Sequence, residues 1–154
     1  MSKVLFKPLL AILLIVASLP EAGARNILNC RYGSIEAPEG ISYNRALSAK
    51  SQLEVYSSSD SKSAFAFGSE PNDKGLAAGS IITMMANFMG ISGEISRIKG
   101  RGGVPVYAII NPENGRVFAM AGHRSDPEYT VIIMYGQTDK SRALEYLKTF
   151  QKKQ

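Results

Sequence analysis

The sequence has few of the residues from which recognisable sites are built. Its 154 residues include one cysteine and one histidine. A single cysteine excludes an intramolecular disulfide, and together the two residues cannot supply the three or four nitrogen and sulfur ligands that zinc prefers. We find no catalytic or metal-binding motif, and we expect no cofactor. With 45% hydrophobic and 20% charged residues, the composition also excludes collagen-like, coiled-coil, disulfide-dense and broadly disordered proteins.

The N-terminus has an apolar run that is too short to span a bilayer. Leu9 to Ala17 is uninterrupted, but it is about half of the roughly 20 residues that a span needs. Lys3 and Lys7 precede the run, and the small residues Ala22-Gly23-Ala24 follow it. This order predicts a secretory signal peptide over residues 1–24, cleaved near Ala24, with an N-terminal membrane anchor as the alternative.

Export and cleavage would leave a mature chain of residues 25–154 without a transmembrane span, either periplasmic or secreted. Loss of Lys3, Lys7 and Glu21 would lower the formal net charge from +5 to +4. Cys30 lies 13 residues beyond Ala17, so it is poorly placed for lipid modification. We expect a partly buried thiol that behaves as a small apolar residue, with a reactive thiol or an intermolecular bridge as the alternative.

Two segments of the first half carry helical signals. Residues 44–50 are expected to form a short helical turn. Residues 75–90 contain no charge, follow the capping residues Asn72 and Asp73, and end at Gly90. A helix that is apolar nearly all round is normally buried, so we expect Ile81, Met85 and Phe88 to pack in the core. A partner-binding or membrane-binding surface is the alternative.

The second half changes to the two-residue alternation of strands. Strands are predicted over residues 94–99, 104–110, 116–121 and 128–135, with a shorter one at 52–56 and either a hairpin partner or a packed loop at 64–67. Short links between successive strands indicate an antiparallel meander. We therefore predict an α+β domain over residues 51–154, a meander of about four to five strands with two helices packed on it. Residues 25–50 are expected to be an irregular segment.

The last predicted helix has the clearest pattern. Thr138 or Asp139 would cap it. Its apolar stripe consists of Ala143, Leu144, Leu147 and Phe150. Lys152 and Lys153 follow at the end where the helix dipole favours cations. The stripe would cover one face of the sheet.

The predicted sheet is apolar on both faces. Alternation places in one set Val106, Ala108, Ile110, Val117, Ala119, Val131 and Ile133, and in the other Tyr107, Ile109, Phe118, Met120, Ile132 and Met134. An antiparallel sheet with a solvated face is normally polar on that face. The second set is therefore a candidate interaction surface, for a second copy of the chain or an envelope protein partner. Coverage by residues 25–70 of the same chain is the alternative.

Three basic residues alternate near a glycine-rich stretch. Arg97, Lys99 and Arg101 would share one strand face beside Gly100-Arg101-Gly102-Gly103. Such a stripe is a candidate anion-binding site for phosphates or for anionic glycans and lipids. Export argues against nucleic acid as the ligand. A solvated edge strand guarded by basic residues is the alternative.

The only histidine, His123, lies in the predicted turn Gly122 to Pro127 with Ser125 and Asp126. Catalytic triads usually gather residues from separate elements, so we expect a solvated turn histidine. An enzyme with an unrecognised site near His123 and Asp126 remains an alternative, and it requires a concave pocket that joins them to residues distant in sequence.

Two resemblances add expectations. Gly103 to Ile110, followed by the turn Asn111 to Gly115, resembles the second half of a thioredoxin-like domain, in which a cis proline opens a strand. The Cys-x-x-Cys of that family is absent, so the resemblance implies a degenerate domain without dithiol chemistry. Residues 50–150, with the stretch Asp126 to Thr130 and Gly136, resemble an uncharacterised family of small exported bacterial α+β domains. That resemblance implies a non-enzymatic binding or structural domain of the envelope or secreted fraction, and it brings no catalytic residues.

Overall fold

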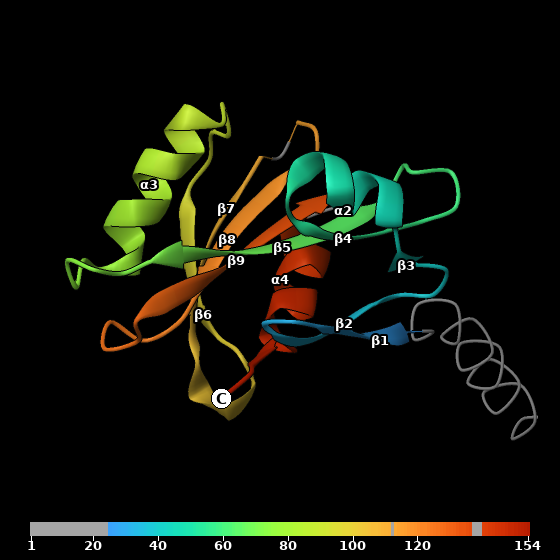
Figure 1. The fold of residues 1–154 in the computed structure, drawn as a ribbon. Helices are drawn as coiled ribbons and strands as arrows, with labels where there is room; N and C mark the ends of the chain where they lie inside the picture. The colour runs from blue at the N-terminus through green and yellow to red at the C-terminus, as the bar shows by residue number, and fades with distance from the viewer. Residues whose placement is uncertain (1–24, 112, 137–139) are drawn as a thin grey trace, which may run out of the picture.

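The computed structural model describes residues 25–111, 113–136 and 140–154. Within these residues the chain forms ten strands and three α-helices, shown in Figure 1. The strands are β1 (Arg25–Cys30), β2 (Gly33–Pro38), β3 (Ser42–Tyr43), β4 (Glu54–Ser57), β5 (Ala64–Pro71), β6 (Ile95–Lys99), β7 (Pro105–Ile110), β8 (Val117–Ala121), β9 (Glu128–Tyr135) and β10 (Gln151–Lys152). The helices are α2 (Arg45–Ser51), α3 (Ala78–Phe88) and α4 (Lys140–Lys148), with a short 3-10 turn, η1 (Arg101–Gly103).

The predicted fold, a meander of four to five strands with two helices, is wrong. Strands β6 to β9 do follow one another as a meander, but they belong to a seven-stranded antiparallel sheet of order β3-β4-β5-β9-β8-β7-β6. A second sheet contains β1, β2 and β10, with β2 in the middle. The two halves of the large sheet join where β5 pairs with β9 over eight residues. No local pattern reveals that long-range pairing.

The segment expected to be irregular, residues 25–50, contains regular elements. It holds β1, β2, β3 and most of α2. β1 and β2 pair from Arg25–Pro38 to Cys30–Gly33 as a tight hairpin. Its glycines and prolines suggested loops, but Gly33 and Pro38 stand at the two ends of β2, where they are tolerated.

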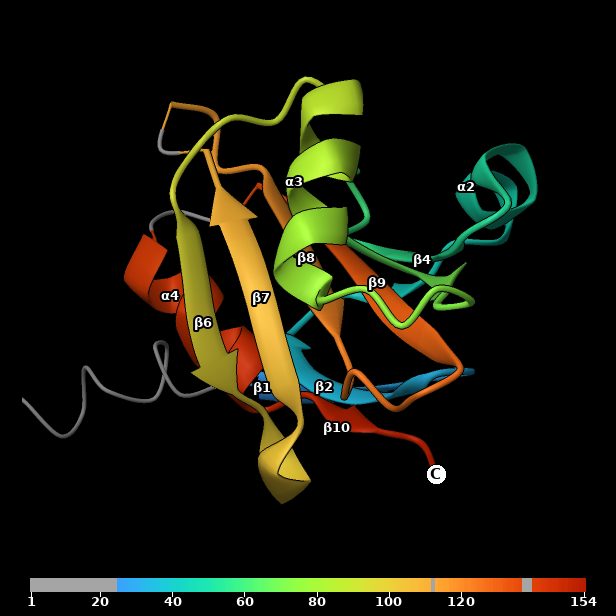
Figure 2. The ribbon, with the colours of Figure 1, turned by 90° about the vertical axis from the view of Figure 1, so that its left-hand side faces the viewer.

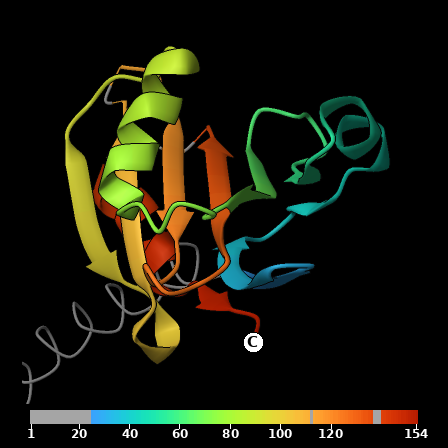
Figure 3. The ribbon, with the colours of Figure 1, turned by 60° about the vertical axis from the view of Figure 1, so that its left-hand side comes forward.

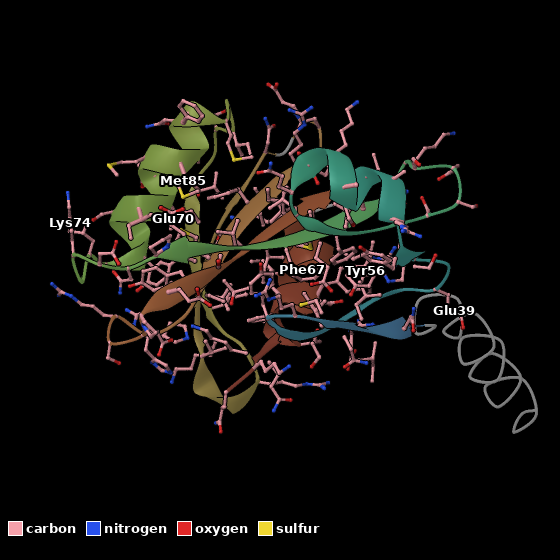
Figure 4. All side chains as sticks on the ribbon, in the orientation of Figure 1. Glu39, Tyr56, Phe67, Glu70, Lys74 and Met85 are labelled. Atoms are coloured by element: carbon pink, nitrogen blue, oxygen red, sulfur yellow. The ribbon has the colours of Figure 1, made fainter. Side chains whose placement is uncertain are left out.

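Each face of the large sheet is covered by other parts of the same chain. On one face, α4 and the three-stranded sheet enclose a core that we call the hairpin-side core, which contains Leu28, Ile35, Ala37, Phe65, Phe67, Ile132, Leu147 and Phe150. On the opposite face, α3 encloses the α3-side core, which contains Ile81, Ile82, Ala86, Ile109, Phe118, Met120, Val131 and Ile133. Figure 2 shows α3 in front of the sheet and α4 behind it. In Figure 4, Tyr56 and Phe67 lie between the two sheets.

The predicted apolar interaction surface is not a single exposed face. Tyr107, Ile109, Phe118 and Met120 do share one face, in the α3-side core. Ile132 and Met134 belong to the hairpin-side core. The prediction placed Ile132 and Met134 on the same face as Phe118. In the structure Phe118 pairs with Ile133 and Val117 with Met134, and paired residues share a face, so Met134 lies on the face of Val117. The turn between the strands sets this register, and a shift of one residue exchanges the faces. Tyr107 is half-buried and the other five residues are buried.

Helix α3 ends as predicted but differs at its start and on its outer face. At Gly90, where φ is +69°, the N–H of Ile91 donates to the carbonyl of Ala86, which is a Schellman-type stop. The N-cap is Ala77, and no side chain caps the helix. Ile81 is buried as expected, whereas Met85 is only half-buried, although it packs against the α3-side core. The expectation for Phe88 is wrong, because 93% of it is exposed. Within residues 25–111, 113–136 and 140–154, no helix is both long and apolar enough to cross a membrane.

The predicted apolar stripe is buried, but α4 ends at Lys148, two residues before Phe150. Ala143, Leu147 and Phe150 are buried, and Leu144 packs against the same core. The stripe also includes the buried Tyr146, which the sequence analysis did not select. The predicted caps, Thr138 and Asp139, lie outside the described residues. After α4 the chain forms β10, which pairs with β2 and brings the C-terminal lysines beside the N-terminal hairpin.

Candidate functional site

The C-terminal segment is held between the β1–β2 hairpin and the η1 turn. Arg101 N–H donates to the Phe150 carbonyl (2.8 Å), and Lys153 N–H donates to the Tyr32 carbonyl (2.8 Å). Two glycines permit this close approach. A Cβ at Gly33 would collide with the Gln151 carbonyl oxygen, and one at Gly100 would lie 2.5 Å from the Phe150 carbonyl oxygen. The sequence therefore fixes where β10 lies, and with it Lys152 and Lys153.

A cleft of about 940 Å³ opens where these segments meet. We call it the central cleft. Its lining comes from four separate segments and includes Cys30, Ser34, Arg101, His123, Asp126, Glu128, Lys152 and Lys153. The cleft thus joins His123 and Asp126 to residues distant in sequence, as the enzyme alternative requires.

One ion pair organises the central cleft. Lys152 Nζ donates to Asp126 Oδ2 (2.9 Å) and to the Glu128 carbonyl (2.8 Å). The backbone N–H of His123 also donates to Asp126 Oδ2 (2.8 Å). Partial burial alone would raise the pKa of Asp126, but the hydrogen bonds from Lys152 Nζ and the His123 backbone N–H, with the positive charge of Lys152, leave that pKa below its ordinary value. Asp126 is therefore an ionised structural partner of Lys152.

The other reactive groups of the central cleft are not arranged as a nucleophile and its base. Burial raises the pKa of the Cys30 thiol, more than nearby backbone N–H groups lower it, so the reactive thiolate is disfavoured. The His123 side chain is exposed, and within the described part of the chain no hydrogen bond orients its imidazole. Among the described residues, no three or more His, Cys, Asp or Glu side chains are grouped to hold a metal ion.

Two smaller clefts continue from the central cleft. The hairpin cleft, about 360 Å³, shares Glu128, Lys152, Lys153 and Gln154 with it. The helix cleft, about 510 Å³, lies beside α2 and shares Arg31 and Tyr32 with the hairpin cleft. Because neighbouring clefts share lining residues, we treat the three as one groove, which passes the turn of the β1–β2 hairpin.

The groove carries more positive than negative side chains. Its cations are Arg31, Arg45, Arg101, Lys152 and Lys153, and its carboxylates are Glu54, Asp126 and Glu128. Lys152 is paired with Asp126, and Arg101 with Glu36. Arg31, Arg45 and Lys153 are exposed and form no ion pair among the described residues. Three cations are thus available to a ligand.

Only one of the three predicted anion-binding residues lies in this groove. Arg101 lines the central cleft. Arg97 and Lys99 lie on β6, the edge strand of the large sheet, and the Arg97 guanidinium stacks 5.6 Å from the centroid of the Tyr107 ring. Arg31 and Arg45 were not among the residues predicted from the sequence. Lys152 and Lys153 were predicted at the end of a helix, although two adjacent lysines were a signal of positive charge.

A second exposed surface lies on α3. Its large apolar side chains are Leu76, Met84, Phe88 and Met89, with Ile95 at the start of β6. The polar residues Ser80, Thr83 and Asn87 are exposed on the same helix. In Figure 3, α3 lies on the left, whereas α2 and the β1–β2 hairpin lie on the right. The end of the groove beside α2 and the β1–β2 hairpin therefore lies on the other side of the molecule from the α3 surface.

No protein-family model and no curated protein matches this chain. The functional argument therefore depends on the geometry of the groove and on its charges.

Proposed function

We propose that the protein is an exported, non-enzymatic binding domain of the bacterial envelope or secreted fraction, and that the groove binds an anionic ligand. The observation that carries this proposal is the presence of Arg31, Arg45 and Lys153 around one groove with no ion pair among the described residues. Unpaired cations along a concave surface attract anions and raise their local concentration.

Export with cleavage after Ala24 is compatible with the contacts of Arg25. Arg25 is the first residue after the predicted cleavage point, and it belongs to β1. Its side chain pairs with Glu36 (3.2 Å) and Glu145 (3.3 Å). Cleavage after Ala24 would therefore leave these contacts intact. N-terminal sequencing of the protein recovered outside the cytoplasm should begin at Arg25, and an intact Met1 would contradict export with cleavage.

The groove itself is tested with two variants that each lose one positive charge. Lys153→Gln removes a cation of the groove, whereas Lys74→Gln removes an exposed cation in the loop before α3. Calorimetry with a sulfated disaccharide in low salt should show binding that is weakened several-fold by Lys153→Gln and unchanged by Lys74→Gln, because only Lys153 faces the ligand. Equal weakening by both variants would show that net charge, and not the groove, accounts for binding.

An enzyme is the second candidate, and the central cleft is the observation that favours it. The cleft places the exposed His123 near Cys30 and the Lys152–Asp126 pair. A hydrolytic activity abolished by His123→Ala would support this candidate. We favour binding because Asp126 accepts from Lys152 and from the His123 backbone N–H, and not from the imidazole as a triad acid does.

A further inference from the structure

We infer that the groove takes an extended acidic polysaccharide chain and not a compact anion, an inference that rests on the proposed binding function. The central, hairpin and helix clefts follow one another, with volumes of about 940, 360 and 510 Å³. The central and hairpin clefts share four lining residues, and the hairpin and helix clefts share two. A ligand chain that lies over these shared residues can contact all three clefts.

The cations are distributed along the whole groove. Arg101 lies in η1, Lys152 and Lys153 in the C-terminal segment, Arg31 in the hairpin turn and Arg45 at the start of α2. The central cleft and the helix cleft have no lining residue in common. A compact anion in one of them would leave the cations of the other unused. A chain with repeated negative charges can engage successive cations, and each linked contact adds to the affinity.

Tyrosines line the part of the groove beside α2. Tyr32 lines both the hairpin and helix clefts, and Tyr43, which is 56% exposed, lines the helix cleft. The Tyr43 ring packs edge-to-face on Tyr56, with ring centroids 5.6 Å apart. The Tyr56 hydroxyl is held in turn, 2.6 Å from Glu54 Oε1 and 2.8 Å from the Asn29 carbonyl. These contacts hold the exposed Tyr43 ring in place, so that it offers an apolar surface to a sugar ring of the ligand.

The carboxylates of the groove favour a ligand chain that carries hydroxyl donors between its negative charges. Glu54, Asp126 and Glu128 are interleaved with the cations. Carboxylate oxygens accept hydrogen bonds, and sugar hydroxyls donate them. A polysaccharide that presents hydroxyls between its charged groups is complementary to both kinds of side chain.

The experiment measures binding of uronate-containing sulfated oligosaccharides from two to eight sugars long. We expect the wild-type affinity to rise about tenfold or more from the disaccharide to the octasaccharide, because the longer chain reaches the helix cleft. The distal double variant Tyr43→Ala/Arg45→Gln should lose most of that rise and keep the disaccharide affinity. Lys74→Gln is the charge control. A thermal unfolding midpoint within about 2 °C of wild type shows that the distal variant is folded.

The outcomes separate the inference from the function on which it rests. Disaccharide binding that depends on Lys153 but does not strengthen with length would overturn the inference and leave the proposed function standing. An octasaccharide affinity that the distal variant retains would also overturn it. Failure of every anion to bind would overturn both. Tighter binding of single-stranded DNA with the same number of charges would replace the polysaccharide with nucleic acid.

Discussion

The two covers of the large sheet are built in different ways. The α3-side core is closed mainly by one continuous helix, whereas the hairpin-side core is closed by β1, β2, α4 and Phe150, which come from both ends of the described chain. A cover assembled from distant segments has boundaries between those segments. The groove follows the boundaries between the hairpin, η1, the β8–β9 turn and β10. The α3-side cover is mainly a single helix, and this helix exposes large apolar side chains. The comparison teaches that the proposed binding groove lies where the β1–β2 hairpin meets the C-terminal segment.

The largest expected effect contrasts the same substitution on the two covers. Phe150 is fully buried in the hairpin-side core, whereas Phe88 is 93% exposed on α3. Phe150→Ala should lower the free energy of unfolding by about 3–5 kcal/mol, and Phe88→Ala should change it by less than about 0.5 kcal/mol. Urea unfolding of both variants measures the difference. A similar loss at both positions would show that α3 buries Phe88 against a partner in solution.

A smaller loss of stability is expected when the close contact between Gly33 and β10 is disturbed. A methyl group there would collide with the Gln151 carbonyl oxygen, so Gly33→Ala should displace β10 and cost about 1–3 kcal/mol. Gly40→Ala is the control, because Gly40 also has a positive φ (+83°) but nothing within 4 Å of an added Cβ. Gly33→Ala should also weaken disaccharide binding. Equal destabilisation by the two variants, with binding retained, would contradict the role of β10 in building the groove.

The smallest effect concerns the Lys152–Asp126 pair and depends on pH. The pKa of Asp126 is below its ordinary value in the folded protein. The pair therefore stabilises the fold above the unfolded-state pKa of about 3.9, and this contribution is lost as pH falls through the lower folded-state pKa. Asp126→Asn should lower the melting temperature at pH 6, and the gap from wild type should close in strong acid. A gap that stayed constant from pH 6 to pH 2 would contradict this account.

Local signals in the sequence identify many elements but not their pairing. The stop at Gly90, the stripe of α4 and the strands within residues 94–135 follow from turns, glycines and alternation over a few residues. The pairing of β5 with β9 and the face of each β9 residue depend on register between segments, which alternation in one strand leaves open. Phe88 misled the analysis because an apolar residue on an uncharged helix gives no sign of which side the sheet covers.

The groove was even less accessible to sequence analysis. Arg101 was selected from its glycine-rich surroundings, but its neighbours in the groove come from other segments. Lys153 lies beside Tyr32 only because β10 pairs with β2 after α4 has crossed the core. Patterns within a few consecutive residues do not reveal which charged residues, distant in sequence, lie together in the groove.

The most direct test of the central claim is an amide ¹H–¹⁵N NMR titration of the mature chain with the acidic octasaccharide. The account predicts that the largest shift changes fall in the groove segments, at residues 31–34, 45–49, 101–103 and 151–154, while α3 (Ala78–Phe88) stays unchanged. Changes centred on α3 would contradict the account and would show that the apolar side of this helix is the binding surface.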